Sequence, residues 1–277
     1  MVHDLNMPAP ADRCTVFRNL HESGCFVIPN PWDAGTARVL AKLGFPALAT
    51  TSSGSAWSMA RRDNHITLDQ SLAHLRTIAE SVTVPVNADF EGGFANYPED
   101  VAENVARAVE TGIAGLSIED STGDASNPLY EFDLAVERIR AARQAIERSG
   151  TRVLLTGRSE GFICGRPDLK ETIHRLEAYA GAGAECLYAP GIASLDDIRA
   201  IVGAVAPRPV NVLARPTFTV REIASTGARR ISVGGGFARA AWTAFLDAAK
   251  EAQQKGTFTA IGRAVPGSEM NALFIDN

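Results

Sequence analysis

Short, nearly continuous apolar segments alternate along the chain with segments whose apolar positions recur at helical spacing. The apolar segments are rich in β-branched residues, which is typical of strands that are buried on both faces. We predict such strands at 25–29, 47–51, 84–90, 115–119, 153–156, 186–189, 210–213 and 230–233. After a first helix at 12–22, the predicted helices are 33–43, 67–81, 97–110, 133–148, 168–179, 194–205, 220–225 and 238–254.

Eight strand–helix units in strict alternation predict an α/β fold, a (β/α)8 barrel in which residues 1–277 form a single domain. A doubly wound sheet is the rival architecture, but it has no natural use for eight such regular units. The stretch from strand 47–51 to Asn64 is predicted as a polar loop. The tail 257–277 has apolar residues without a clear period, and we expect it to pack on the barrel or on a neighbouring subunit.

The composition is that of an ordinary globular protein. The 277 residues are 45% hydrophobic and carry a net charge of −5 without a basic patch, which argues against a nucleic-acid partner. No apolar run is long enough to span a membrane, and Met1–Asn6 shows neither the basic nor the apolar region of a signal peptide. Four cysteines, none in a Cys-x-x-Cys pair, indicate reduced thiols and a cytoplasmic protein.

Acidic residues stand where two neighbouring strands end. Asp89 and Glu91 close the third strand, and Glu119 and Asp120 close the fourth. Neighbouring strands lie only about 4.8 Å apart, so carboxylates that end both strands can share one divalent cation. Side chains alternate along a strand, so Asp89 and Glu119 can converge in a barrel mouth while Asp120 faces the helices. Hard oxygen ligands of this kind predict Mg²⁺, with Mn²⁺ as an alternative.

For several other residues, the sequence allows either a role in the site or a purely structural role. A single carboxylate at a strand end is more often a helix cap or an ion-pair partner, and we expect that role for Asp120 and Glu160. Gly234–Gly236 is either a phosphate-binding turn or simply a tight turn. His65 could act as a base, although a lone loop histidine is more often solvated, and Cys164 could reach the site from the loop after the fifth strand.

Further motifs fall at strand ends or in the loops that follow them: Ser53-Gly54, Asp63, Asn87-Ala-Asp89, Ile118-Glu-Asp120, Gly157-Arg158 and Asn211. The order and strand positions of these motifs resemble those of the isocitrate lyase/phosphoenolpyruvate mutase superfamily. The resemblance runs from about Phe26 to Gly236. The resemblance implies a modified (β/α)8 barrel that binds Mg²⁺ largely through water. It also implies a small-molecule 2-oxo acid, or its enolate, chelated to the cation.

The resemblance assigns roles to individual residues. The residues implied for the metal shell are Asp89, Glu119 and Asn87. Those implied for substrate binding are Ser53, Gly54 and Asn211. Those implied for catalysis are Arg158, Asp63 and Asn127. Members are usually tetramers that exchange the last helix between paired subunits, so we expect a homo-oligomer, a dimer or tetramer, in which helix 238–254 and the tail take part.

Departures from the superfamily pattern narrow the expected activity. Lyases of the isocitrate and methylisocitrate type carry a Lys-(Lys/Arg)-Cys-Gly-His loop where this chain reads Ser-Thr-Gly-Asp-Ala-Ser-Asn-Pro-Leu at 121–129. Without that cysteine or histidine to protonate a carbanion, those two activities are not expected. Asn127 matches an Asn of the mutases and phosphonopyruvate hydrolases. Their loop lysine is missing, with Ala125 in its place, and their strand-six histidine is missing, with Tyr188-Ala-Pro-Gly191 in its place. Asn87 replaces an acid of the metal region, and Glu91 can restore its charge.

These observations predict a Mg²⁺-dependent carbon–carbon lyase or decarboxylase. Its expected substrate is a small 2-oxo or 2-hydroxy dicarboxylic acid, oxaloacetate-like or a substituted malate, cleaved through a metal-bound enolate with loop 121–132 as the lid. The alternatives are a carbon–phosphorus mutase or hydrolase of the phosphonopyruvate type, and a barrel that binds 2-oxo acids with little turnover. A phosphate-binding barrel that uses Gly234–Gly236 is a further alternative.

Overall fold

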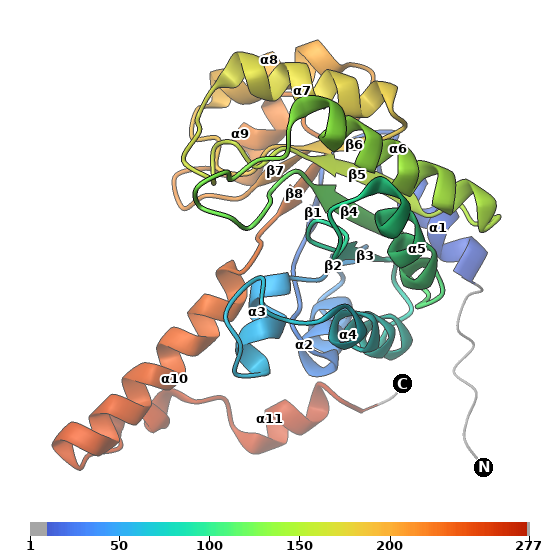
Figure 1. Ribbon diagram of the computed structural model, residues 1–277. Helices are drawn as coiled ribbons and strands as arrows, with labels where there is room; N and C mark the ends of the chain where they lie inside the picture. The colour runs from blue at the N-terminus through green and yellow to red at the C-terminus, as the bar shows by residue number, and fades with distance from the viewer. Residues whose placement is uncertain (1–9, 276–277) are drawn as a thin grey trace, which may run out of the picture.

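The structure, a computed structural model, describes residues 10–275 and is built on eight parallel strands (Figure 1). The strands are β1 Phe26–Ile28, β2 Leu48–Ala49, β3 Val86–Asp89, β4 Gly115–Glu119, β5 Leu154–Arg158, β6 Cys186–Tyr188, β7 Val210–Leu213 and β8 Arg230–Ser232. Their order is β1-β8-β7-β6-β5-β4-β3-β2. Ala49 N donates to the carbonyl of Pro29 at 3.0 Å, so the ends of β1 and β2 meet and the barrel is nearly closed.

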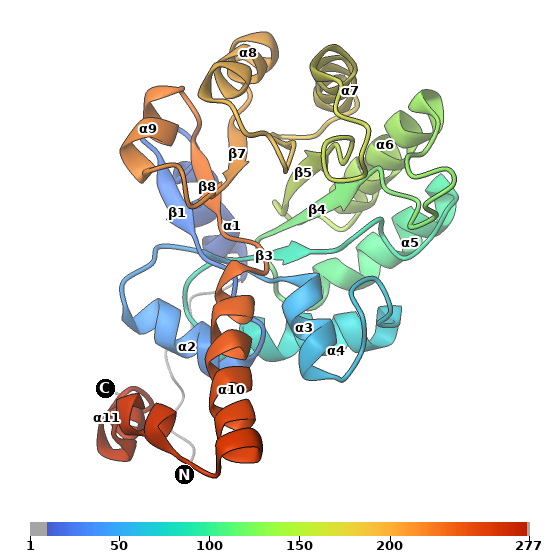
Figure 2. The same ribbon diagram turned by 90° about the vertical axis from the view of Figure 1, so that its left-hand side faces the viewer.

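Helices surround the eight-stranded sheet (Figure 2). The predicted (β/α)8 barrel is therefore confirmed. The helices are α1 Pro10–Asn19, α2 Ala34–Lys42, α3 Ser52–Ser58, α4 Leu68–Ser81, α5 Pro98–Val109, α6 Phe132–Arg148, α7 Leu169–Gly181, α8 Leu195–Val205, α9 Val220–Ser225, α10 Gly236–Lys255, the 3-10 helix η1 Thr259–Arg263 and α11 Gly267–Ala272.

The starts of α2 and α4 follow from local sequence. Asp33 caps α2 and accepts a hydrogen bond from Thr36 N at 2.7 Å, while Thr36 Oγ1 accepts one from Asp33 N. Thr67 and Gln70 form the same reciprocal pair at the start of α4. Both are capping boxes, which satisfy backbone N–H groups that a helix leaves unpaired.

The predicted polar loop between β2 and Asn64 is wrong in its first half. Residues Ser52–Ser58 form α3, because Thr51 caps the helix and accepts a hydrogen bond from Gly54 N. A Cβ at Gly54 would lie 2.7 Å from Thr51 Cγ2 and 2.9 Å from Trp32 Cβ, so only glycine fits this turn. The helix therefore packs close to the mouth of the barrel.

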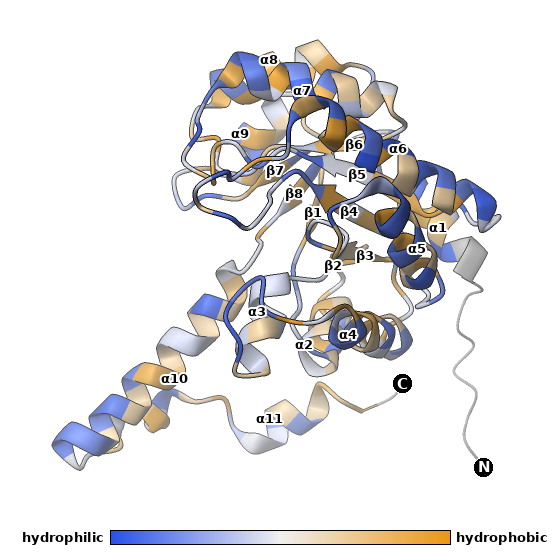
Figure 3. Cartoon of the chain, in the orientation of Figure 1, coloured by the Kyte–Doolittle hydropathy of each residue, from blue (hydrophilic) through white to orange (hydrophobic). Residues whose placement is uncertain are grey.

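The C-terminal part of the chain leaves the barrel. Helix α10 projects away from it (Figures 1 and 2), and of its side chains only that of Ala238 is buried. Apolar residues alternate with polar ones along this exposed helix (Figure 3), with Trp242, Phe245 and Leu246 exposed. The tail then turns back, and Lys42 Nζ of α2 donates to the carbonyl of Ala272 at 2.8 Å.

The stretch Met1–Asn6, on which the prediction about a signal peptide rests, lies outside the described residues. Among the helices that the structure describes, none combines the length and the apolar character that crossing a membrane requires.

One row of the sheet carries polar side chains across five strands. Glu119 on β4 is in register with Arg158 on β5, and Arg158 with Tyr188 on β6. Tyr188 is in register with Asn211 on β7, and Asn211 with Arg230 on β8. A row of polar side chains across the strands of a barrel marks a place where a site can form.

Candidate active site

Arg158 lies at the centre of a cluster of carboxylates. Its Nη1 lies 3.1 Å from Asp89 Oδ1 and 3.2 Å from Glu119 Oε2, and its Nε donates to Glu160. Asp89 and Glu119 end neighbouring strands and meet at this one guanidinium nitrogen. The convergence that the sequence predicts for these two acids is therefore present, with Arg158 between them.

The carboxylate of Asp89 is held by the segment that leads into α3. Ser52 N donates to Asp89 Oδ2 at 3.0 Å, and Asp89 N donates to Thr50 Oγ1 at 2.9 Å. Because both contacts come from the end of β2, the position of Asp89 depends on the strand pairing between β2 and β3.

A cavity of about 180 Å³ opens at the mouth of the barrel beside this cluster. We call it the mouth cavity. Predicted site residues that line it are Ser53, Asp63, Asn87, Asp89, Arg158 and Asn211. Glu119 lines a second cavity of about 240 Å³ together with Glu91. Gly54 does not line either one, and its amide is engaged with Thr51 Oγ1 at 3.3 Å.

The cluster holds more negative charge than its arginine can balance. Burial raises the pKa of Glu119 well above its ordinary value, and Arg158 offsets this only in part. Burial, together with Asp89 and Asp63, raises the pKa of Glu91 to about 8. Burial and Asp89 also raise the pKa of Asp63. Such mutual shifts are expected where several carboxylates compete for too little positive charge.

The donor set fits the divalent cation that the superfamily implies. Asn87 Oδ1 and Glu91 Oε1 are buried oxygen atoms without a hydrogen-bond partner among the described residues. In residues 10–275 no three His, Cys, Asp or Glu side chains are grouped so that they alone could hold a metal ion. Carboxylate and amide oxygens of this kind are the ligands that a hard cation such as Mg²⁺ takes.

Glu91 adopts an unusual backbone conformation at the edge of this cluster. Its φ is +49°, in the left-handed region that few residues other than glycine adopt. Its carbonyl accepts a hydrogen bond from Glu119 N at 3.1 Å, which fixes the two acids side by side. Backbone strain of this kind clusters at functional sites.

The loop 121–132, which is predicted to be the lid, forms a small hairpin. Thr122 N donates to the carbonyl of Pro128 at 3.0 Å, and Tyr130 N donates to that of Asp120 at 2.9 Å. Asn127 is exposed and lines a different cavity, so the structure does not bring it together with Asp89 and Glu119. Asn127 lines neither the mouth cavity nor the cavity that Glu119 lines.

Comparison with known proteins now identifies the family. The profile of the phosphoenolpyruvate phosphomutase family matches residues 17–253. The chain belongs to this family. The 2-methylisocitrate lyase of Escherichia coli is 30% identical over 205 residues, 70% of this chain and 68% of the relative. The oxaloacetate decarboxylase of Rhodopseudomonas palustris is 30% identical over 227 residues, 77% and 74% of the two chains.

A solved structure is more similar still. The crystal structure of a candidate lyase/mutase from Burkholderia cenocepacia has a TM-score of 0.92 and 48% sequence identity, and the match covers 96% of this chain and 97% of that one. The resemblance to the isocitrate lyase/phosphoenolpyruvate mutase superfamily is therefore confirmed, and the chain is a lyase of this superfamily.

Residues outside the mouth cavity take the structural roles that the sequence suggests for them. Asp120 faces the helices, where it accepts hydrogen bonds from Tyr179 Oη at 2.6 Å, from Arg175 and from Glu160 N at 2.7 Å. Glu160 is the ion-pair partner of Arg158. His65 is exposed and hydrogen-bonded within its own loop.

Two other candidates also have partners in the structure. Asn30 Oδ1 accepts hydrogen bonds from Val233 N and Gly234 N, both at 2.9 Å, so this family member uses the glycine turn to join β8 to β1. Cys164 Sγ lies 3.9 Å from Ser121 Oγ at the base of the lid. The amide of Gly234 is therefore already engaged, and Cys164 does not line the mouth cavity.

Sequence reasoning missed two arginines of the mouth cavity. Arg230 is buried and bonded to Asn211, Thr156 and His21, without an acidic partner among the described residues. Arg239, in the first turn of α10, has no side-chain hydrogen bond or ion pair with the described residues. Strand alternation could have placed Arg230 inside the barrel. No local signal in the sequence marks Arg239.

Proposed function

We propose that this lyase cleaves a carbon–carbon bond in a small 2-oxo or 2-hydroxy dicarboxylic acid, oxaloacetate-like or a substituted malate, by way of an enolate. The observation that carries the proposal is the contact of Arg158 with both Asp89 and Glu119 beside the mouth cavity. Formation of an enolate builds negative charge on the ketone oxygen of the substrate. A cation site and an arginine side by side can stabilise that charge.

The divalent cation is the proposed cofactor, Mg²⁺ or Mn²⁺. Asp89, Glu119 and Asn87 would hold it, and Glu91 adds a carboxylate where Asn87 replaces an acid. When bound, the cation supplies Lewis-acid polarisation of the substrate's ketone. The guanidinium of Arg158 is the protein group that stabilises the negative charge of the enolate. Its ion pair with Glu160 orients this guanidinium. Asp63 is proposed to hold or transfer a proton near this group.

The opposite wall of the mouth cavity is suited to substrate carboxylates. A Cβ at Gly235 would lie 2.7 Å from Ser53 Oγ and 3.2 Å from Arg239 Nη1, so both groups face this turn. We propose that Ser53 and Arg239 bind one carboxylate of the substrate, with the Gly54 backbone supporting this turn. Asn211, held by Arg230 at 3.0 Å and by Ser232 at 2.9 Å, is proposed to bind the substrate deeper in the barrel.

Decarboxylation is favoured over cleavage of a methylisocitrate. The lid lacks the cysteine and histidine of the methylisocitrate lyases, and loss of carbon dioxide requires no acid at the departing carboxylate. The relatives named as oxaloacetate decarboxylases support this choice, since they match over most of the chain.

A carbon–phosphorus mutase or hydrolase is the second candidate. The name of the matching family and Asn127 in the lid favour it. This activity would require the lid to move so that Asn127 reaches the mouth cavity. A barrel that binds 2-oxo acids with little turnover is the third candidate, because the lid offers neither Lys, Cys nor His.

We also propose an oligomeric state and a cellular location for the protein. The exposed residues Trp242, Phe245 and Leu246 on the projecting α10 favour a homo-oligomer that buries this helix against a second subunit. All four cysteines are free thiols, which supports a reducing compartment, the cytoplasm. We also propose that residues 1–277 act as a single domain.

The test is turnover by the full chain with and without Mg²⁺. Oxaloacetate, 2-methylmalates and phosphonopyruvate are offered to the wild type, to Asp89→Ala and to a control, Asp100→Ala, whose side chain is exposed on α5. Metal-dependent loss of a dicarboxylic acid, abolished only in Asp89→Ala, supports the lyase. Turnover of phosphonopyruvate alone would support the second candidate, and no turnover of any compound would contradict both.

A further inference from the structure

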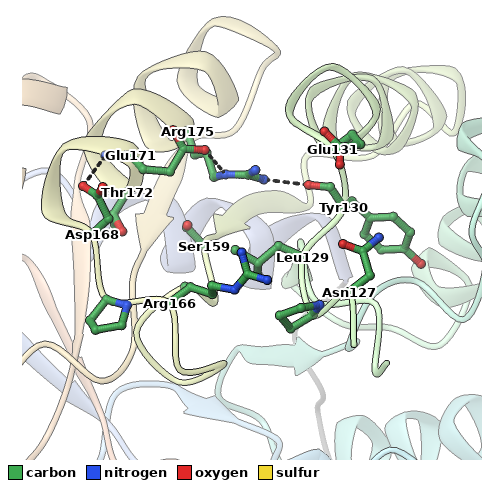
Figure 4. Close-up of a pocket in the computed structure, with 13 residues that line it drawn as sticks. Asn127, Leu129, Tyr130, Glu131, Ser159, Arg166, Asp168, Glu171, Thr172 and Arg175 are labelled. Atoms are coloured by element: carbon green, nitrogen blue, oxygen red, sulfur yellow. Dashed lines mark hydrogen bonds and ion pairs between the residues drawn. The ribbon is translucent and has the colours of Figure 1, made fainter. Parts of the chain in front are cut away.

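A cavity of about 570 Å³ lies outside the barrel mouth, between the lid and the first turns of α7 (Figure 4). We call it the α7 cavity. Its walls are the second half of the lid, the end of β5 and the loop that precedes α7. None of its lining residues lines the mouth cavity. The buried residues Asp120 and Glu160, joined by a hydrogen bond of 2.7 Å from Glu160 N, are not part of its wall. Its volume is typical of sites for small molecules.

Ser159 points to a ligand in this cavity. The residue is 1% exposed, it lines the α7 cavity, and its hydroxyl has no hydrogen-bond partner among the described residues. It follows Arg158 on β5, so strand alternation turns it away from the barrel mouth and toward α7. Buried hydroxyl groups of native proteins are normally hydrogen-bonded, so the expected partner is an ordered water or a polar group of a bound molecule that replaces it.

Arg166 supplies a charge to the same cavity. Its backbone N donates to the carbonyl of Gly161 at 2.8 Å, which closes the loop and fixes the position of the residue. Figure 4 shows its side chain extending between Ser159 and Asn127. The guanidinium forms no hydrogen bond or ion pair with any residue in the described range. A planar guanidinium with open donors binds a carboxylate in two-point fashion.

Most acidic groups in the wall are already engaged. Asp168 caps α7 and accepts hydrogen bonds from Lys170 N and Glu171 N. The carboxylate of Glu171 accepts one from Arg175 Nε at 2.7 Å. Glu131, at the lid end of the wall, is exposed to solvent. Asp168 and Glu131 keep their negative charge, and Arg166 is the positive charge of this wall without an ion-pair partner among the described residues.

We propose that the α7 cavity binds a small organic acid whose carboxylate is held by Arg166 and Ser159, and that this ligand regulates the lid. Asn127 and Tyr130 of the lid belong to the wall, and Arg175 Nη1 ties the carbonyl of Tyr130 to α7 at 3.0 Å. An occupant holds the lid where it is, with Asn127 away from the carboxylate cluster. It therefore opposes lid closure. The binding claim does not depend on the proposed reaction.

Binding is tested by calorimetry on the full chain in EDTA, so that no metal supports binding at the barrel mouth. The probes are succinate, glutarate and gluconate, acids without a 2-oxo group. At least one is expected to bind with a stoichiometry of one, and about tenfold more weakly to Arg166→Gln and Ser159→Ala. Arg221→Gln, an exposed arginine on α9, and Asp89→Ala are expected to bind it as the wild type does.

The outcomes separate this proposal from the lyase activity. Absence of saturable binding by all three acids, or binding that is weakened by Asp89→Ala and not by Arg166→Gln, would overturn the site. Because Arg166 is exposed, Arg166→Gln provides a folded variant even if Ser159→Ala is destabilised. Hydrogen exchange at 121–130 tests the regulation: the bound acid is expected to increase protection there, and unchanged protection would contradict the effect on the lid.

Discussion

Glu119 and Arg158 face each other in register across β4 and β5, and Glu119 Oε2 lies 3.2 Å from Arg158 Nη1. The same nitrogen lies 3.1 Å from Asp89 Oδ1. One guanidinium thus holds two carboxylates from neighbouring strands at the barrel mouth. A group so placed can position a cation site and stabilise a developing negative charge in the same cavity.

Replacing Arg158 by Gln is expected to abolish most of the activity. The change removes the positive charge next to the enolate and leaves Asp89, Glu119 and Glu160 without their common partner. We expect kcat to fall by about 100-fold to 1000-fold, the range for loss of one stabilising donor. Steady-state kinetics with the active dicarboxylic acid measure this. A kcat within a few-fold of the wild type would show that Arg158 does not act on the reacting group.

Glu91 is expected to make the stability of the metal-free protein depend on pH. Its pKa of about 8 lies above its ordinary value of 4.5, so the folded protein holds this proton more tightly than the unfolded one. The contribution to stability is therefore complete below about pH 4.5 and is lost as pH rises through about 8. When Tm is measured in EDTA between about pH 4.5 and about pH 8, it should change less with pH for Glu91→Gln than for the wild type. Identical slopes for the two proteins would contradict the shift.

Restoring an acid at Asn87 is expected to strengthen metal binding. Asn87→Asp adds a carboxylate where the buried Oδ1 has no partner among the described residues. We expect the Kd for Mn²⁺ to fall by about tenfold and the metal-free Tm to fall, because a further buried negative charge is unfavourable without a cation. Calorimetry and thermal unfolding measure the two effects. An unchanged Kd would place the cation away from Asn87.

Arg239 is expected to affect substrate binding more than chemistry. Its guanidinium faces the same turn as Ser53 and lines the mouth cavity. Arg239→Gln should raise KM about tenfold with little change in kcat, as for an interaction that is equal in the ground and transition states. Arg221→Gln serves as the matched control. A large fall in kcat at constant KM would assign Arg239 to the chemical step.

Features set by local sequence were predictable. The caps at Asp33 and Thr67 depend on residues three positions apart, and the strands carry their own apolar pattern. The convergence of Asp89 and Glu119 was also predictable, because parallel strands end at one edge of the sheet. Helix α3 was missed, since a run of Thr, Ser and Gly is equally typical of a loop.

Features set by tertiary contacts were not predictable. The position of Arg158 between two acids depends on the register of β4 against β5. The side of the lid on which Asn127 lies depends on the hairpin between Thr122 and Pro128. Arg239 reaches the mouth cavity only because α10 starts at the glycine turn after β8. Each is a relation between distant segments that a local pattern does not contain.

The most direct test of the central claim is whether the mouth cavity binds a divalent cation together with a 2-oxo acid analogue. Thermal unfolding of the wild type and of Asp89→Ala is measured with Mg²⁺, with oxalate, which mimics the enolate, and with both. The account predicts that Tm rises most with both ligands together and that Asp89→Ala loses this rise. A Tm that does not respond to the pair, or that responds equally in Asp89→Ala, would contradict the assignment of the site.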